Sequence, residues 1–306
     1  MPLQRRDALG ERQRVFSSRP GTPGRGVGGE GTWPGIVPPP HLRPLSPEAG
    51  ARGDYFLPLA LFRVIILGSM LCAKPVDHVF AVEPATARPG IVFVVDGVGG
   101  LDLMGKAAKW ALPKAGVAHE IREFEWQHGK GNILKDLQDT KRVVQKAHEL
   151  AICVLRVKAA DPKRPIYLLG KSGGTGLVLA AAEELPPATL ERIVLLSSAL
   201  APNYDLRPAL RATKHELVSF YSPLDQFILG WGTRQFGTID RVYGPSAGLT
   251  GFVLPKRCSK VDEVLYGRVV QLPWSPRMIW EGHVGGHTGT SMPAFVGKEV
   301  APWLKP

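Results

Sequence analysis

The sequence predicts an α/β domain over residues 82–306, with a mostly parallel central sheet and helices on both faces. The first observation is the apolar run from Ile91 to Val95, bounded by Gly90 and Asp96. A continuous β-branched run of this length is typical of a strand buried on both faces. The second observation is that strand-length apolar runs alternate with helical patterns from there to the C-terminus, which favours a parallel sheet.

The remaining elements are expected in a regular order. Residues 102–113 have a helical pattern, residues 119–126 alternate weakly as a strand does, and residues 132–159 carry apolar side chains at helical spacing for one long helix or two. Beyond them we expect strands at 166–169, 193–196, 217–221 and 278–280, and helices at 176–185 and 293–303.

The N-terminal segment 1–55 is predicted to be disordered. Its first 53 residues contain ten glycines and nine prolines and have neither helical nor strand periodicity. Such a segment buries too little apolar surface to offset the entropy lost on ordering.

Residues 56–81 have the pattern of a signal peptide. Arg63 precedes an apolar run at 64–73, and Val79-Phe80-Ala81 places small or apolar residues where a signal peptidase reads them. We therefore expect export to the periplasm or the exterior; a membrane anchor or a buried helix of a cytoplasmic protein are the alternatives. The run is short for a membrane span, so stable membrane insertion of the mature domain is not expected.

Charge and cysteine content narrow the class of protein. The net charge of +11 favours a nucleic-acid or membrane surface at first sight. After residue 63, however, Lys and Arg are mixed with Asp and Glu, and no basic block alternates with aromatic residues, so nucleic acid is not an expected partner. Cys72, Cys153 and Cys258 fit neither a zinc site nor a disulfide framework; free or buried thiols are favoured over a Cys153–Cys258 bridge.

The motif with the clearest chemical meaning is Gly170-Lys171-Ser172-Gly173-Gly174, which matches Gly-x-Ser-x-Gly between a predicted strand and a predicted helix. In such a turn the serine stands at a strained apex, and the flanking residues must be small because the chain passes close by. The motif predicts Ser172 as a nucleophile, with the Gly173 amide as an oxyanion donor.

Two nucleotide-binding interpretations are weaker. A P-loop ending in Gly170-Lys171-Ser172 requires glycine at position 165, which is Pro165. The run Gly97-Val98-Gly99-Gly100 is similar to a dinucleotide loop, but its last required glycine falls on Asp102. No cofactor is expected.

With this motif in its strand–helix context, the chain resembles the α/β-hydrolase superfamily over roughly residues 88–306, as an esterase- or lipase-like serine hydrolase. The resemblance implies a catalytic triad in the chain order Ser, acid, His. The acid position follows the second strand after the motif, which corresponds to Asp225; Asp205, after the preceding strand, is the alternative acid.

The histidine of the resemblance belongs to a loop ahead of the last helix. His287 in Gly285-Gly286-His287 matches this place, and His283 is the alternative base. The two histidines are four residues apart, but the glycines around them argue against a helix and no third ligand is evident, so a metal site is not expected. The second oxyanion donor is expected at the Val98 amide, although Asp96 stands where the family more often has histidine.

These residues imply hydrolysis of a small-molecule or lipid ester through an acyl-enzyme. The long segment 226–276, which is rich in glycine and aromatic residues, is expected either to form a lid over the acyl pocket or to be a surface excursion. The alternative function is a non-catalytic binding protein with the same fold.

Overall fold

A computed structural model describes residues 89–305, except for 227, 230–232, 234–236 and 254–258. The predicted disordered segment 1–55 and the predicted signal segment 56–81 lie outside the described residues, as do Cys72 and Cys258. Cys153 is a free, half-buried thiol.

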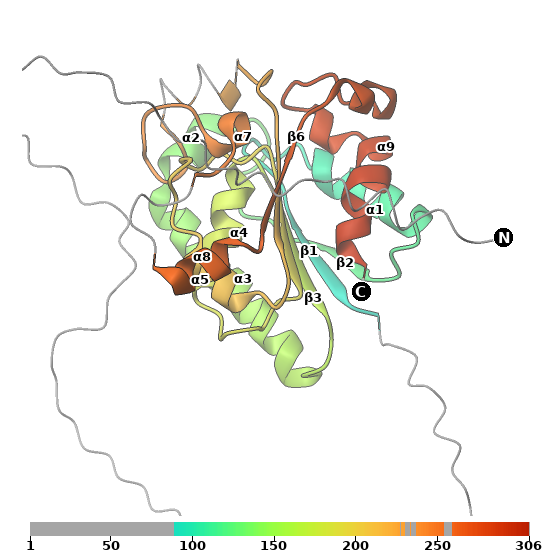
Figure 1. Cartoon of the computed structure of the whole chain (residues 1–306), viewed down its shortest axis with the longest axis vertical. Helices are drawn as coiled ribbons and strands as arrows, with labels where there is room; N and C mark the ends of the chain where they lie inside the picture. The colour runs from blue at the N-terminus through green and yellow to red at the C-terminus, as the bar shows by residue number, and fades with distance from the viewer. Residues whose placement is uncertain (1–88, 227, 230–232, 234–236, 254–258, 306) are drawn as a thin grey trace, which may run out of the picture. The chain divides into compact units, whose positions relative to one another are not determined.

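The described part of the chain is built on one six-stranded sheet in the order β2-β1-β3-β4-β5-β6, with every neighbouring pair parallel (Figure 1). The strands are β1 Ile91–Val95, β2 Glu120–Glu123, β3 Ile166–Lys171, β4 Arg192–Leu196, β5 Leu217–Tyr221 and β6 Val269–Pro273. The prediction of a parallel α/β sheet is therefore confirmed.

Helices cover both faces of this sheet. The α-helices are α1 Leu103–Lys114, α2 Ile133–Gln138, α3 Thr140–Ala160, α4 Gly173–Glu183, α5 Arg207–Ala212, α7 Ala247–Thr250, α8 Lys260–Tyr266 and α9 Pro293–Phe295. Shorter 3-10 and π turns are η2 Pro276–Glu281, η3 Gly289–Ser291, η4 Val296–Val300 and η5 Ala301–Leu304. In Figure 1, α3, α4 and α5 lie on one side of the strands, and α1 and α9 lie on the other.

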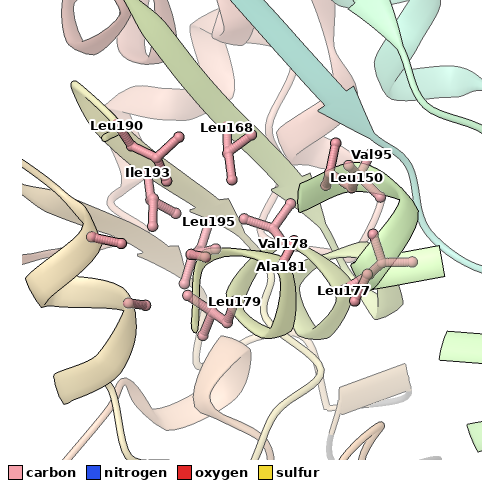
Figure 2. Close-up of a cluster of buried hydrophobic side chains, with 14 of the residues drawn as sticks. Val95, Leu150, Leu168, Leu177, Val178, Leu179, Ala181, Leu190, Ile193 and Leu195 are labelled. Atoms are coloured by element: carbon pink, nitrogen blue, oxygen red, sulfur yellow. The ribbon is translucent and has the colours of Figure 1, made fainter. Parts of the chain in front are cut away.

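Each face of the sheet has its own apolar core. Alternate side chains of β1 point to opposite faces, so Phe93 and Val95 join the core under α3 and α4, whereas Val92 and Val94 join the core under α1 and η4. Figure 2 shows the first of these cores, where Val178 and Leu179 of α4 meet Leu195 of β4. Burial of one such side chain contributes roughly 1.5–3 kcal/mol.

The predicted strand at 278–280 is wrong, and the sixth strand is β6, nine residues earlier. Pro276 opens η2 at its first turn, and Gly282, with φ 80°, ends it. Within η2 Met278 is buried, but the Trp280 side chain is 89% exposed. The apolar residues at 278–280 therefore do not form a buried strand. The strand β6 was missed because its residues are only half-buried, so its sequence is not a continuous apolar run.

The other predicted elements are present, most of them with shifted ends, and the helix predicted at 293–303 consists of α9, η4 and η5 in succession. Residues 132–159 form two helices, α2 and α3. The helix predicted from residue 176 begins at Gly173, because α4 starts directly after the turn at Ser172. Among the described helices, none is both long and apolar enough to span a bilayer.

Candidate active site

Ser172 lies at the apex of a sharp turn from β3 into α4. Its backbone has φ 51° and ψ −124°, a conformation that costs a non-glycine residue roughly 1–3 kcal/mol. The Ser172 amide donates to the Leu196 carbonyl of β4 over 2.9 Å, which ties the turn to the neighbouring strand.

The glycines around Ser172 are required by close approach of the chain. A Cβ added to Gly174 would lie 2.4 Å from the Val95 carbonyl oxygen and 2.5 Å from that of Asp96. A Cβ added to Gly170 would lie 3.0 Å from Thr175 Cα. Only glycine allows β1, β3 and α4 to meet this closely.

Two loops from distant parts of the chain bring an acid and a base to Ser172. His287 Nε2 lies 2.9 Å from Ser172 Oγ, and His287 Nδ1 lies 2.6 Å from Asp225 Oδ2. Because a carboxylate accepts hydrogen bonds, Nδ1 carries the hydrogen and Nε2 presents its lone pair to the serine hydroxyl. Asp225 is almost fully buried at 3% exposure, so the contact is shielded from water.

The loop that carries His287 is fixed by contacts from three neighbours. Ser222 Oγ donates to the Gly285 carbonyl over 2.6 Å, and Trp274 Nε1 donates to the His283 carbonyl over 2.7 Å. Lys171 Nζ donates to the carbonyl of His287 itself over 3.1 Å. The imidazole is therefore held from β3, from the end of β5 and from the segment after β6.

The two alternative residues have other partners. Asp205 forms an ion pair with Arg207 over 2.8 Å on the surface beside α5. His283 is buried, its Nδ1 accepts from the Gly285 amide over 3.3 Å, and its ring meets Phe295 edge-on at 4.9 Å. Burial lowers the pKa of His283 to about 4, so this imidazole is neutral near pH 7 and supports the loop.

Burial of His287 favours the neutral form of its imidazole. Burial lowers the pKa of His287, and the ammonium group of Lys171 lowers it further, while the carboxylates of Asp225 and Asp96 oppose both effects. Lys171 is itself buried, which lowers the pKa of its amine against the opposing pull of Asp96 and Asp225.

The loop after β1 lies directly beside Ser172. A Cβ added to Gly97 would be 3.1 Å from Ser172 Cβ, and one added to Gly173 would be 3.0 Å from Val98 Cγ1. In the described part of the chain, the amides of Val98 and Gly173 have no hydrogen-bond acceptor. Two free N–H groups thus adjoin the serine hydroxyl, one of them at the N-terminus of α4, where the helix dipole favours negative charge.

Several residues that hold the loop beside Ser172 were not predicted from the sequence. Trp126 Nε1 donates to the Asp96 carbonyl and Gln127 Nε2 donates to the Gly97 carbonyl, each over 2.8 Å. Asp136 accepts from the Gly99 amide over 2.7 Å. Their position after β2 could have indicated that they lie near the site, because the carboxyl ends of parallel strands share one edge of the sheet.

The segment 226–276 is only partly described. Its described parts contact the body of the domain: the Ile239 amide donates to the Ala199 carbonyl over 2.9 Å, and the Gly248 amide donates to the Ser198 carbonyl over 2.8 Å. The Ile239 side chain also packs on Gly176 of α4. A lid over the acyl pocket stays a prediction. Among the described residues, no cluster of three or more His, Cys, Asp or Glu side chains is arranged to hold a metal ion.

No family model matches the chain, and no curated protein sequence does. Solved structures with a similar arrangement include a cutinase from Trichoderma reesei in complex with a phosphonate inhibitor, at 16% identity, a TM-score of 0.34 and coverage of 70% of this chain and 77% of the other. A lipase-esterase related protein from Clostridium acetobutylicum has 14% identity, a TM-score of 0.38 and coverage of 70% and 94%.

A third similar structure, a protein from Thermus thermophilus, has 15% identity, a TM-score of 0.39 and coverage of 72% and 91%. Likenesses at these TM-scores decide nothing about chemistry. The parallel sheet in the order β2-β1-β3-β4-β5-β6, with Ser172 at a sharp strand–helix turn and helices on both faces, gives this chain an α/β-hydrolase-like fold.

Proposed function

We propose that the protein is a serine hydrolase that cleaves carboxylic esters, with Ser172 as nucleophile, His287 as general base and Asp225 as the acid that orients it. The observation that carries this proposal is the continuous chain of two hydrogen bonds from Asp225 through His287 to Ser172 Oγ, at 2.6 Å and 2.9 Å. Such a chain activates a hydroxyl that is otherwise a weak nucleophile.

The reaction proceeds in two halves. His287 Nε2 takes the proton of Ser172 as its oxygen attacks the ester carbonyl carbon, and the carbonyl oxygen becomes an oxyanion that the Val98 and Gly173 amides stabilise. His287 then gives the proton to the departing alcohol, which leaves an acyl-serine. Water, deprotonated by the same imidazole, attacks the acyl-serine, releases the carboxylic acid and returns the proton to Ser172.

Apolar side chains beside the site favour an ester with an apolar acyl group. Leu101, Ile133, Leu224 and Val284 are each between 46% and 69% exposed. Ile133 packs on Gly99 in the oxyanion loop, and Leu224 packs on Gly285 in the loop of His287. Apolar side chains on the oxyanion loop and on the loop of His287 would stabilise a bound alkyl chain by removing its surface from water.

The test is labelling with a fluorophosphonate probe together with hydrolysis of p-nitrophenyl esters of graded chain length. We expect wild type to be labelled and Ser172→Ala to be unlabelled, with a fall in kcat of on the order of 10⁶-fold, because the attacking oxygen is gone. A matched control is Ser259→Ala, which removes a hydroxyl at the N-cap of α8 and leaves Ser172 in place. Folded wild type that neither labels nor hydrolyses any ester would favour the non-catalytic alternative.

A further inference from the structure

The loop from Asp96 to Gly100, which carries the Val98 amide, is held by an unusually complete set of polar contacts. Gln127 Nε2 donates to the Gly97 carbonyl over 2.8 Å, and the Gly131 amide donates to the Gly99 carbonyl over 2.9 Å. The Gly97 amide donates to the carboxylate of Asp96 over 2.7 Å. The Val98 amide between these paired groups has no acceptor among the described residues.

Asp136 is the buried member of this set. Its side chain is 1% exposed, at the middle of α2, and one carboxylate oxygen accepts from the Gly99 amide over 2.7 Å. The other oxygen accepts from the His128 amide over 2.8 Å and lies 2.9 Å from His128 Nδ1. A buried carboxylate requires several donors to offset its desolvation, and here one of the donors is a backbone amide next to Val98.

The His128 ring lies between two carboxylates, with Nδ1 facing Asp136 and Nε2 lying 3.2 Å from Asp139 Oδ2. Arg142 Nε and Nη2 donate to the carbonyls of Trp126 and Gln127 over 2.6 Å and 2.9 Å. The segment that anchors the oxyanion loop is therefore itself fixed to the start of α3.

We propose that Asp136 and Gln127 are positioning residues for the oxyanion hole: they hold the two peptide groups that flank Val98 and so aim its amide at the oxygen that develops on the substrate. The inference rests on the proposed function. Neither residue touches the substrate; each acts through the backbone of the Asp96–Gly100 loop.

Asp136→Asn is the informative variant, because it replaces an acceptor by a donor. If the side-chain oxygen of the introduced asparagine keeps its contacts with the His128 amide and Nδ1, its NH₂ group would face the Gly99 N–H. Two donors would then meet, and the loop would lose the hydrogen bond from the Gly99 amide. The matched control is Asp139→Asn: it is the same change three residues away, against the same imidazole. Asp139 accepts from the Arg142 amide as the N-cap of α3, a role that asparagine also performs.

The experiment compares kcat and KM for a p-nitrophenyl ester in wild type and variants, with thermal unfolding of each. We expect Asp136→Asn to lower kcat by about 10- to 100-fold with little change in KM, somewhat less than deletion of a whole oxyanion donor. Asp139→Asn should keep kcat within about twofold of wild type. A purely structural carboxylate would lower the melting temperature and leave kcat per folded molecule unchanged.

Gln127→Met keeps the experiment decisive if Asp136→Asn does not fold, because Gln127 is half-buried and tolerates an apolar replacement. It should lower kcat at constant KM, although less than Asp136→Asn. Active wild type together with unchanged kcat in every folded variant overturns the inference and leaves the proposed function intact. Inactive wild type overturns the proposed function itself.

Discussion

Lys171 is the residue with the clearest electrostatic effect on the proposed chemistry. It stands next to Ser172 in the chain, its ammonium donates to the His287 carbonyl over 3.1 Å, and its side chain is 5% exposed. A positive charge this close disfavours a second positive charge on the imidazole. The effect is stronger at this buried site than at the protein surface, because little water screens the two charges. The lysine therefore helps to keep the base in its neutral form.

A pH profile tests this role. His287 must be neutral to accept the proton of Ser172, so kcat/KM falls as pH drops through the pKa of His287. Burial and Lys171 lower that pKa, so wild type should keep activity below the ordinary histidine range. Lys171→Met should move the acid limb of kcat/KM to higher pH, whereas Lys106→Met, at an exposed position on α1, should leave it in place. An acid limb at the same pH in both variants would contradict the electrostatic role.

Sequence reasoning reached Ser172, Asp225 and His287 because each lies in a loop whose place is defined by a neighbouring strand or helix. The structure places the three in contact, and their catalytic role stays a prediction for the probe experiment. The roles of Lys171 and Asp136 could not be reached in this way. Their contacts with the His287 carbonyl and the Gly99 amide depend on distances between segments 116 and 37 residues apart.

At the scale of the element, the passage from β3 to α4 depends on the absence of side chains. Gly174→Ala would place a Cβ 2.4 Å from the Val95 carbonyl oxygen, and a backbone oxygen at the end of a buried strand cannot yield cheaply. We expect a loss of about 1–3 kcal/mol in the free energy of unfolding, measured in urea, with reduced activity because β1 leads into the oxyanion loop.

Gly297→Ala is the control for this substitution. Gly297 lies in η4, and its added Cβ would meet Ala111 at 3.8 Å, an ordinary contact. We expect the stability of this variant to stay within about 0.5 kcal/mol of wild type. Equal stability of the two variants would mean that the strand end moves more freely than the structure indicates.

Element prediction succeeded where burial on both faces makes the apolar run continuous, as in β1, β3 and β4. It failed at one edge of the sheet, at β6. The residues of β6 are half-buried, so their pattern is weaker than that of 278–280, where Ile279 and Trp280 are apolar but exposed. Periodicity reports burial, so it is weakest for edge strands: β2 gave only a weak alternation, and β6 was missed.

At the scale of the whole molecule, buried histidines link stability to pH. Burial lowers the pKa of His119, His283 and His287 in the folded protein. The unfolded chain therefore binds protons that the folded chain does not, and stability falls as pH drops below the ordinary histidine pKa of about 6.5. For His283, with a folded pKa of about 4, the loss is complete only near that pH.

Urea unfolding at pH 7.5 and pH 5 measures this linkage. We expect wild type to lose on the order of 2–3 kcal/mol from His283 between neutrality and pH 4, with about two-thirds of that loss reached by pH 5. His283→Gln should be less stable at pH 7.5 but less sensitive to acid, because it removes one of these titrations. His148→Gln, at an exposed position on α3, should keep the wild-type sensitivity. A wild-type stability that is flat between the two pH values would contradict the linkage.

The strand order β2-β1-β3-β4-β5-β6 has a consequence for how the protein reaches its native state. Every strand pair is parallel, so each pairing closes a long crossover, and β1 pairs with β3 some 75 residues away in the chain. High contact order of this kind slows folding, because chain entropy is lost before the contacts form. The three site residues Ser172, Asp225 and His287 follow different strands of this sheet, so they meet only after its last crossovers close. In a partly folded chain the Ser172 hydroxyl would therefore lack His287 as its base.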